Sequence, residues 1–236
     1  MSAAPRPRGR TTPGRARRES RKARRARTGD ILLRLKEEYP DARCALVSRS
    51  PFELLVATIL SAQCTDKRVN AVTPALFTRF PAAADFAAAE LGELEEIVRS
   101  TGFFRNKARS LKGLGQALCD RHQGVVPRTM GELTKLPGVG RKTAACVLIF
   151  SFDRPEIPVD THVYRVGGRL GLFRENANLE EAHDEMLAIT PPEDAYELHT
   201  NLIDHGRKVC RPKPRCGECA LRRMCPYFRR NFARPT

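Results

Sequence analysis

The fold is decided by a nine-residue stretch, Leu136–Ala144, which reads LPGVGRKTA. It joins two segments of helical character by a turn too tight for most residue types. Gly138 and Gly140 allow positive φ and leave the backbone bare, so that consecutive N–H groups can converge on one anion. The helix that follows adds its own first-turn N–H groups and the positive end of its dipole. A hairpin of this kind can bind a phosphate, but a short Gly-x-Gly motif taken alone is better explained as a glycine-rich turn with a solvated lysine.

The composition favours a polyanionic partner. The chain has 236 residues, of which 41% are hydrophobic, and a formal net charge of +15. This length allows one large domain or two small ones. The positive charge favours nucleic acid and leaves open a generally basic protein or one that binds ribosomes or a membrane surface. No apolar run approaches the length that crosses a bilayer, so we expect no membrane partner. We also expect a cytoplasmic protein and a monomer.

The first 27 residues are of low complexity, with eleven Arg or Lys and one acid, Glu19. Such a segment buries too little apolar area to offset its ordering entropy, so we predict a disordered basic arm over residues 1–27. An Arg-rich, acid-poor start is also typical of mitochondrial transit peptides. Because the segment lacks an amphipathic face, a nucleic-acid-binding tail is the better interpretation.

The rest of the chain has helical periodicity and no convincing alternating strand. Apolar spacing and capping residues predict about ten helices with short connections, which makes the fold class all-α. The expected segments are approximately 30–39, 50–63, 65–77, 91–100, 107–121, 129–136, 142–150, 161–170, 179–189 and 195–205.

Lys142 and Asp160 are the candidate catalytic pair. Lys142 lies in the first turn of a helix, where the dipole and the adjacent Arg141 disfavour the charged ammonium form and favour the nucleophilic amine. An amine beside a phosphate grip can attack a sugar carbon, if a carboxylate stabilises positive charge and assists proton transfer. Asp160 precedes a helix, so it is equally well explained as an N-cap, and one residue can serve both roles. His162 is better explained as structural.

Four cysteines crowd into sixteen residues near the end of the chain: Cys210, Cys216, Cys219 and Cys225. This clustering indicates a metal centre rather than a disulfide framework. Zinc ribbons use two separated C-x2-C pairs, whereas this loop has one, so an iron–sulfur cluster is favoured and zinc stays open. The remaining cysteines lack ligand spacing and are expected to be buried by packing: Cys44, Cys64, Cys119 and Cys146.

In combination, these features resemble the endonuclease III family, the bifunctional DNA glycosylases of the helix-hairpin-helix superfamily that carry an iron–sulfur loop. The hairpin, the segment Val159–His162 and the four-cysteine loop occur in that family's order. The stretches Leu60–Asp66 (LSAQCTD) and Gly102–Ala108 (GFFRNKA) look like its two DNA-probing segments. The likeness covers about residues 28–228.

The resemblance implies a role for each matching residue. Lys142 matches the nucleophile that attacks deoxyribose C1′, expels an oxidised pyrimidine and forms a Schiff base, after which β-elimination cuts the strand. Asp160 matches the catalytic aspartate. Gln63 matches the residue that fills the gap left by the flipped-out nucleotide, and Phe103 matches the wedge in the opposite strand. An ordinary loop aromatic is the less favoured interpretation of Phe103.

The resemblance also implies the binding groups and the architecture. The four clustered cysteines match ligands of a [4Fe–4S] cluster. The hairpin contacts expected for damaged double-stranded DNA are Gly138, Val139, Gly140 and Arg141, with Lys213 and Arg215 of the cysteine loop as further phosphate contacts. The implied all-α fold has two lobes, a helical bundle over 50–154 and a cluster lobe over 28–49 and 155–228, followed by a tail over 229–236. A bacterial, nucleoid-associated enzyme of base excision repair is the implied setting.

Two departures from the family pattern bear on specificity. The first cysteine gap holds five residues instead of six, which implies a tighter loop with displaced Lys213 and Arg215. The wedge Phe103 is aromatic where the family commonly has an aliphatic residue. Two other functions stay open: a monofunctional, adenine-removing glycosylase, disfavoured by Lys142 and by the short chain beyond the cysteines, and a non-catalytic hairpin DNA-binding module.

Overall fold

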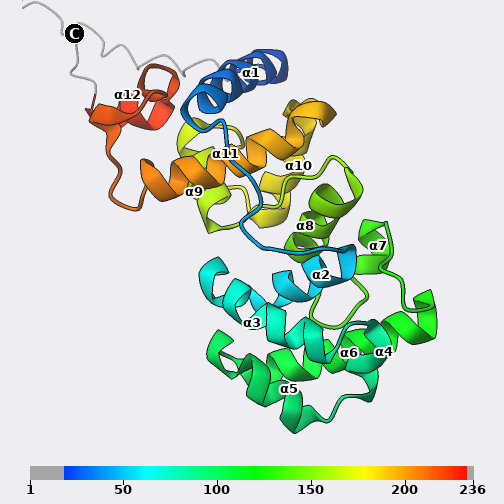
Figure 1. Ribbon diagram of the computed structural model, residues 1–236. Helices are drawn as coiled ribbons and strands as arrows, with labels where there is room; N and C mark the ends of the chain where they lie inside the picture. The colour runs from blue at the N-terminus through cyan, green and yellow to red at the C-terminus, as the bar shows by residue number, and fades with distance from the viewer. Residues whose placement is uncertain (1–18, 233–236) are drawn as a thin grey trace, which may run out of the picture.

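The computed structural model describes residues 19–232, and all regular elements in that range are helical (Figure 1). The α-helices are α1 (Arg21–Glu38), α2 (Pro51–Leu60), α3 (Asp66–Arg79), α4 (Ala83–Ala88), α5 (Leu91–Val98), α6 (Phe104–His122), α7 (Met130–Leu133), α8 (Arg141–Phe152), α9 (Thr161–Leu170), α10 (Leu179–Ile189), α11 (Ala195–Lys208) and α12 (Pro226–Phe232). The predicted all-α class is confirmed. None of these helices is long and apolar enough to span a membrane.

The first lobe packs α2 to α8 around one apolar core (Figure 1, lower half). Phe80 and Phe86 meet at its centre, with ring centroids 5.4 Å apart. The short, alanine-rich α4, which the sequence did not predict, lies against α6 at Gly115. A Cβ on Gly115 would come 2.7 Å from the backbone nitrogen of Ala87, so the close approach of these helices requires glycine.

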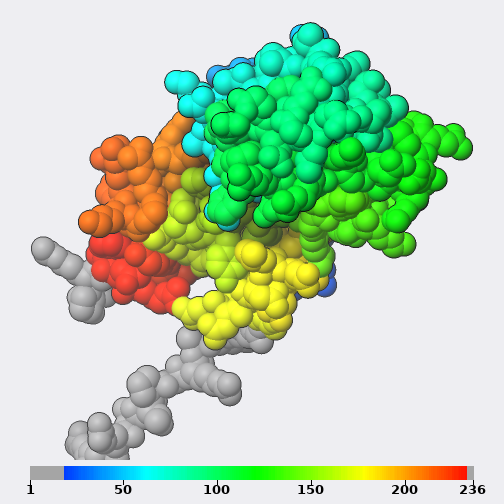
Figure 2. Space-filling model, turned by 90° about the horizontal axis from the view of Figure 1, so that it is seen from below, coloured from blue at the N-terminus to red at the C-terminus, as the bar shows by residue number. Residues whose placement is uncertain are grey.

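The second lobe joins α1 to α9, α10, α11 and α12 around a separate core (Figure 1, upper half). Members of this core include Ile31 and Leu35 from α1, Val163 and Val166 from α9, and Leu202 from α11. Seen from below, the first lobe in cyan and green lies above the yellow-to-red helices of the second (Figure 2). The two-lobed form is therefore built from segments distant in sequence.

The prediction of a disordered arm over residues 1–27 is wrong for its last part. Helix α1 begins at Arg21, where the side chain of Ser20 caps it by accepting a hydrogen bond from the Ala23 amide at 3.2 Å. Arg27 donates to the carbonyl oxygens of Leu170 at 2.6 Å and Gly171 at 3.0 Å. Arg27 thus satisfies carbonyl groups at the C-terminal end of α9, and composition alone does not reveal such a contact. Residues 1–18 of the predicted arm lie outside the described residues.

The predicted tail over 229–236 also begins too early. Residues 229–232 complete α12, in which the rings of Phe228 and Phe232 stack with centroids 5.9 Å apart. Arg230 Nη1 forms an ion pair with Glu175 at 2.9 Å, which ties α12 to the loop before α10. The last four residues, 233–236, lie outside the described range.

Helix α8 contributes to both cores. Ala144, Val147 and Leu148 pack in the first lobe, whereas Ile149 packs in the second. The connection from α8 to α9 then enters the second core through Ile157 and Val159. The start of α8, which carries Lys142, is thus positioned by the first lobe, and the start of α9 by the second.

Candidate active site and cysteine cavity

The hairpin has one glycine that needs its conformational freedom and one that does not. Gly138 has φ +76°, and a Cβ there would lie 2.9 Å from the Cβ of Ser110. Gly140 has φ −89° and open space around its missing side chain, so positive φ is used at Gly138 alone. Val139 between them is 6% exposed and anchors the turn in the first core. Of Val139, only the backbone is therefore available to a ligand.

The N-terminus of α8 is open to an anion. Its cap residue Gly140 supplies no side-chain hydrogen bond, so first-turn N–H groups point outward without a side-chain acceptor from that position. The neighbouring Arg141, predicted to contact DNA, forms an ion pair with Asp184 of α10. This pair joins the hairpin to the second lobe and partly neutralises the positive charge at the start of α8.

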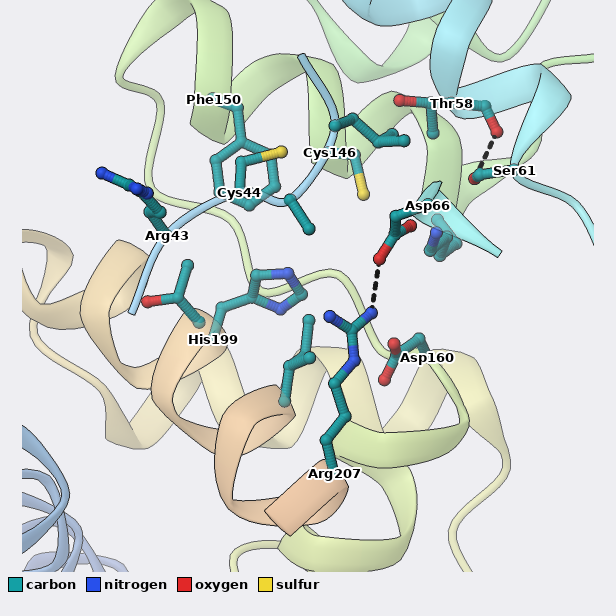
Figure 3. A pocket seen from close by; sticks show the side chains of 15 residues that line it. Arg43, Cys44, Thr58, Ser61, Asp66, Cys146, Phe150, Asp160, His199 and Arg207 are labelled. Atoms are coloured by element: carbon teal, nitrogen blue, oxygen red, sulfur yellow. Dashed lines mark hydrogen bonds and ion pairs between the residues drawn. The ribbon is translucent and has the colours of Figure 1, made fainter. Parts of the chain in front are cut away.

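The structure brings Lys142 and Asp160 together, although eighteen residues separate them in sequence. Both line one pocket between the lobes (Figure 3), which also receives side chains from α2, α3, α8 and α11. The polar members of this lining include Thr58, Ser61, Asp66, Cys146, His199 and Arg207. The pocket therefore has an amine and a carboxylate in its lining, and both lobes contribute residues to it.

Asp160 caps α9 and also lines the pocket. Its Oδ1 accepts a hydrogen bond from the Val163 amide at 2.7 Å and so caps α9. The side chain also lies in the pocket, where Figure 3 shows its carboxylate near Arg207. Capping fixes the rotamer through Oδ1 and leaves the second oxygen for chemistry. The choice between structural cap and catalytic group is therefore not exclusive.

The floor of the pocket is neutral. Burial raises the pKa of the Cys146 thiol to about 11, although the positive charge of Lys142 opposes that rise. Burial lowers the pKa of His199 to about 4, so its imidazole is uncharged near neutral pH, and its Nδ1 is buried without a hydrogen-bond partner in residues 19–232. Low polarity beneath an amine strengthens electrostatic interactions within the site.

Other residues near the pocket had weaker signals in the sequence. His162 shares a 3.0 Å hydrogen bond with Arg165, in keeping with its structural interpretation. Cys146 is buried as expected, whereas three cysteines expected to be buried are only half-buried: Cys44, Cys64 and Cys119. Cys44 and Cys146 both line the pocket. The sequence did not identify Asp66, His199 and Arg207 as site residues. Asp66 was noticeable only as part of a helix start, and the other two had no recognisable pattern.

Gln63 and Phe103 occupy two exposed loops in left-handed backbone. Gln63 has φ +51°, and Phe103 has φ +48° with 63% of its surface exposed. The other non-glycine residues with positive φ in the described chain, Gln123 and Asp153, are ordinary helix C-caps. Gly102, with φ +71° and ψ +154°, takes a conformation open almost only to glycine. Such backbone strain at two exposed tips is a recurring property of binding sites.

The four clustered cysteines surround one cavity in the second lobe. Cys210, Cys216, Cys219 and Cys225 all line it, together with Arg169 and His205. Arg169 Nη1 lies 3.4 Å from Cys210 Sγ, and His205 Nε2 lies 3.5 Å from Cys219 Sγ. N–H groups directed at sulfur are favourable for a thiolate centre.

The four cysteines of the cavity are free thiols and form no disulfide with one another. In residues 19–232 no three His, Cys, Asp or Glu side chains are close enough to hold one metal ion. Zinc would need four sulfurs at about 2.3 Å from one centre, whereas a cubane holds its thiolates farther apart. Arg169 also donates to the carbonyl oxygens of Arg211 at 2.6 Å and Pro212 at 2.9 Å, which fixes the shortened first gap.

The predicted DNA contacts on the cysteine loop are exposed. Lys213 and Arg215 lie on the connection between α11 and Cys216, and Arg215 forms a 3.5 Å ion pair with Glu218. Neither residue lines the pocket that contains Lys142. They are placed on the outer surface of the second lobe, where a contact to a phosphate remains a prediction.

Known proteins of this architecture are DNA repair proteins. A family profile described as "HhH-GPD superfamily base excision DNA repair protein" matches residues 56–192. Endonuclease III of Synechocystis sp. is 48% identical over 85% of this chain and 92% of that protein. Endonuclease III of Bacillus subtilis is 44% identical, over 82% and 89%, and that of Escherichia coli K12 is 41% identical, over 84% and 94%.

Solved structures give the same likeness. A trapped endonuclease III–DNA covalent intermediate, an estranged-adenine complex, matches with a TM-score of 0.84 and 42% identity over 89% of this chain and 99% of that one. A non-covalent endonuclease III–DNA complex matches with a TM-score of 0.83 and 43% identity, over 87% and 97%. A thermostable thymine-DNA glycosylase has a TM-score of 0.80 at 23% identity, over 87% and 98%, which shows the shared fold.

Proposed function

This chain belongs to the HhH-GPD superfamily of base excision DNA repair proteins, and we propose that it removes oxidised pyrimidines from duplex DNA and then cuts the abasic strand. The observation that carries the proposal is the meeting of Lys142 and Asp160 in one pocket between the lobes, beside the hairpin. This reaction needs an amine, a carboxylate and a group that binds the phosphate.

In the proposed mechanism, Lys142 Nζ attacks C1′ of the damaged nucleotide. The C1′–N bond breaks, and its electron pair leaves on the base. Loss of a proton from nitrogen and opening of the C1′–O4′ bond give a Schiff base, and removal of a C2′ proton expels the 3′ phosphate. Asp160 stabilises positive charge on the sugar during the first step and accepts a proton later. The uncapped start of α8 and the backbone of Gly138 and Gly140 hold the adjacent phosphate.

The exposed loops support the extrusion of the nucleotide. A base inside a duplex is out of reach of the pocket, so the nucleotide must leave the stack before attack. We assign Gln63 to the gap that it leaves and Phe103 to the opposite strand, because both side chains are exposed on loops held in left-handed backbone. An exposed ring can part base steps as an apolar wedge.

The cysteine cavity is proposed to hold a [4Fe–4S] cluster through Cys210, Cys216, Cys219 and Cys225. When bound, the cluster would supply a rigid cross-link between α11, the loop and α12. The chain's own contribution is the surrounding of the sulfurs: Arg169 directs an N–H group to Cys210, and a ring nitrogen of His205 lies beside Cys219. Lys213 and Arg215 would then be held toward DNA phosphates. We further place the protein, as a monomer, on the nucleoid DNA of a bacterium.

Borohydride trapping tests the function. Incubation of the full chain with duplex DNA that contains an abasic site, in the presence of borohydride, should give a covalent adduct, and Lys142→Ala should abolish it while DNA binding survives. If the intact protein binds this DNA but forms no adduct, the protein is a non-catalytic DNA-binding module. An adduct that persists in Lys142→Ala would place the nucleophile elsewhere. Iron and zinc analysis of the purified protein tests the cluster: stoichiometric zinc in a colourless preparation would refute it.

A further inference from the structure

A buried chain of hydrogen bonds leads from α1 to one of the clustered cysteines. Helices α1 and α11 pack against each other (Figure 1). The hydroxyl of Tyr39, the C-cap residue of α1, lies 3.0 Å from Nδ1 of His205 in the last turn of α11. The other ring nitrogen, Nε2, lies 3.5 Å from Cys219 Sγ. Tyr39 is 7% exposed and His205 is 3% exposed, so these contacts are shielded from water.

The main chain of His205 supports the same cavity. Its carbonyl oxygen accepts hydrogen bonds from the amides of Val209 at 2.9 Å and Cys210 at 2.8 Å. Cys210 and His205 both line the cysteine cavity. One residue at the end of α11 therefore contacts one cysteine through its backbone and another through its ring. Tyr39 reaches the cavity through that ring.

The direction of the two side-chain hydrogen bonds follows from the chemistry of a metal-bound thiolate. Such a sulfur has no proton and can only accept a hydrogen bond. Burial disfavours the charged imidazolium, so the ring of His205 carries a single N–H group. The contact to Cys219 is attractive when that N–H is at Nε2, and Nδ1 is then the acceptor for the Tyr39 hydroxyl. Donation to Nδ1 also polarises the ring and strengthens the bond that Nε2–H donates.

We propose that Tyr39 and His205 are positioning residues for the cluster: the Tyr39 hydroxyl fixes one tautomer of His205, whose Nε2–H then stabilises the negative charge on the Cys219 thiolate. A hydrogen bond to a ligating sulfur raises the reduction potential of such a cluster, because the reduced form carries more negative charge. The pair therefore helps to set how readily the cluster gains an electron. This inference rests on the proposed cluster and does not depend on the chemistry of Lys142.

The test measures the reduction potential of the cluster in the purified full chain, without DNA. His205→Leu removes the donor, so the ratio of reduced to oxidised protein at a fixed potential should fall about tenfold, which is about 59 mV for one electron. Tyr39→Phe keeps the imidazole but leaves Nδ1 without its partner, so the potential should fall by less. In both variants the iron–sulfur stretching bands of the resonance Raman spectrum should move to higher frequency, because the Cys219 thiolate donates more strongly to iron when its hydrogen bond is weakened.

A double-mutant cycle separates this relay from simple packing. His205→Gln keeps an amide N–H near the position of Nε2 but has no tautomer for Tyr39 to select. Adding Tyr39→Phe to His205→Gln should therefore change neither the potential nor the spectrum. The control is Tyr196→Phe, because Tyr196 lies at the opposite end of α11 and packs edge-on against Phe150. This control should match wild type in both measurements.

A wild-type potential and Raman spectrum in Tyr39→Phe would overturn the inference. A full Tyr39→Phe shift in the His205→Gln background would also overturn it, because the hydroxyl would then act without the imidazole. Tyr39→Phe is the deciding variant if His205→Leu does not retain iron. A colourless wild-type protein with stoichiometric zinc would instead refute the proposed cluster, and this inference with it.

Discussion

The ammonium of Lys107 donates a hydrogen bond to the carbonyl oxygen of Leu60 at 2.8 Å and thereby connects the two exposed loops that carry Gln63 and Phe103. Its second bond, to Thr101 at 2.7 Å, holds the segment just before Phe103, while Leu60 ends the helix just before Gln63. Lys107 is 5% exposed, and burial lowers its pKa. A buried lysine thus holds the loops of the two side chains that are proposed to enter the duplex.

Replacing Lys107 with methionine should impair base flipping more than it impairs the fold. The apolar chain is retained, but both carbonyls lose their donor, so the loops can move independently. We expect duplex excision to slow by about tenfold, or 1.4 kcal/mol, and 2-aminopurine placed beside the lesion to lose its fluorescence gain on binding. Lys112→Met is the matched control, because Lys112 on the same helix makes a similar 2.8 Å bond to Ala89 away from the loops. A fluorescence gain equal to wild type in Lys107→Met would contradict this coupling.

Gly138 and Gly140 should respond differently to alanine. Gly138→Ala must accommodate φ +76° and a Cβ 2.9 Å from Ser110, which should cost about 2 kcal/mol of unfolding free energy and weaken DNA binding. Gly140→Ala meets neither strain nor neighbours, so its stability should stay within about 0.5 kcal/mol of wild type. Urea unfolding of the pair measures this. Equal destabilisation at both sites would show that the turn geometry is not the cause.

Stability should fall in mild acid because of His199. Burial holds its pKa at about 4, against an ordinary value of 6.5, and the nearby Asp160 only partly opposes this shift. Between these two pKa values His199 binds a proton in the unfolded chain but not in the folded chain. Its contribution to stability is therefore complete above pH 6.5 and declines as pH falls toward 4. The loss from this group can reach about 3 kcal/mol. Urea unfolding at pH 7.5 and 5 should show a smaller pH effect in His199→Gln than in wild type; an unchanged difference would assign the acid sensitivity to other groups.

Two truncations should separate charge from structure in the N-terminal region. Removing residues 1–18 deletes six arginines and no acid, so it should weaken DNA binding and flatten its salt dependence without affecting melting. Removing residues 1–27 also deletes Arg21 and Arg27, which bond to the carbonyls of Ala188 and Leu170, so it should lower the melting temperature. If the shorter deletion leaves the salt dependence of DNA binding unchanged, the arm does not contact phosphates as proposed.

The sequence was informative where physical signals are local. Capping residues such as Thr129 and Asn178 marked helix starts that the structure has, and the hairpin glycines marked a turn. The start of α1 was misplaced because the sequence suggested that arginines such as Arg27 are solvated. In the structure Arg27 donates a hydrogen bond to a carbonyl oxygen 143 residues away. Local periodicity does not reveal such partners.

The same limit applies to the candidate site. Lys142 and Asp160 were found through their helix starts, which are local features. The ion pair between Asp66 and Arg207 spans 141 residues, and the bond from Lys107 to Leu60 spans 47. These contacts depend on how helices pack, and no spacing rule within one helix or loop predicts them. His199 carried no signal, because an imidazole on an apolar helix face is usually a core residue.

The placement of α8 across both cores has a consequence for the safety of the cell. The amine of Lys142 is positioned by the first core, and the carboxylate of Asp160 by the second. A nascent or partly unfolded chain with a single lobe in place would carry half of the strand-cutting apparatus. Competence to break DNA would then arise only when the halves have docked, so immature copies leave the genome intact.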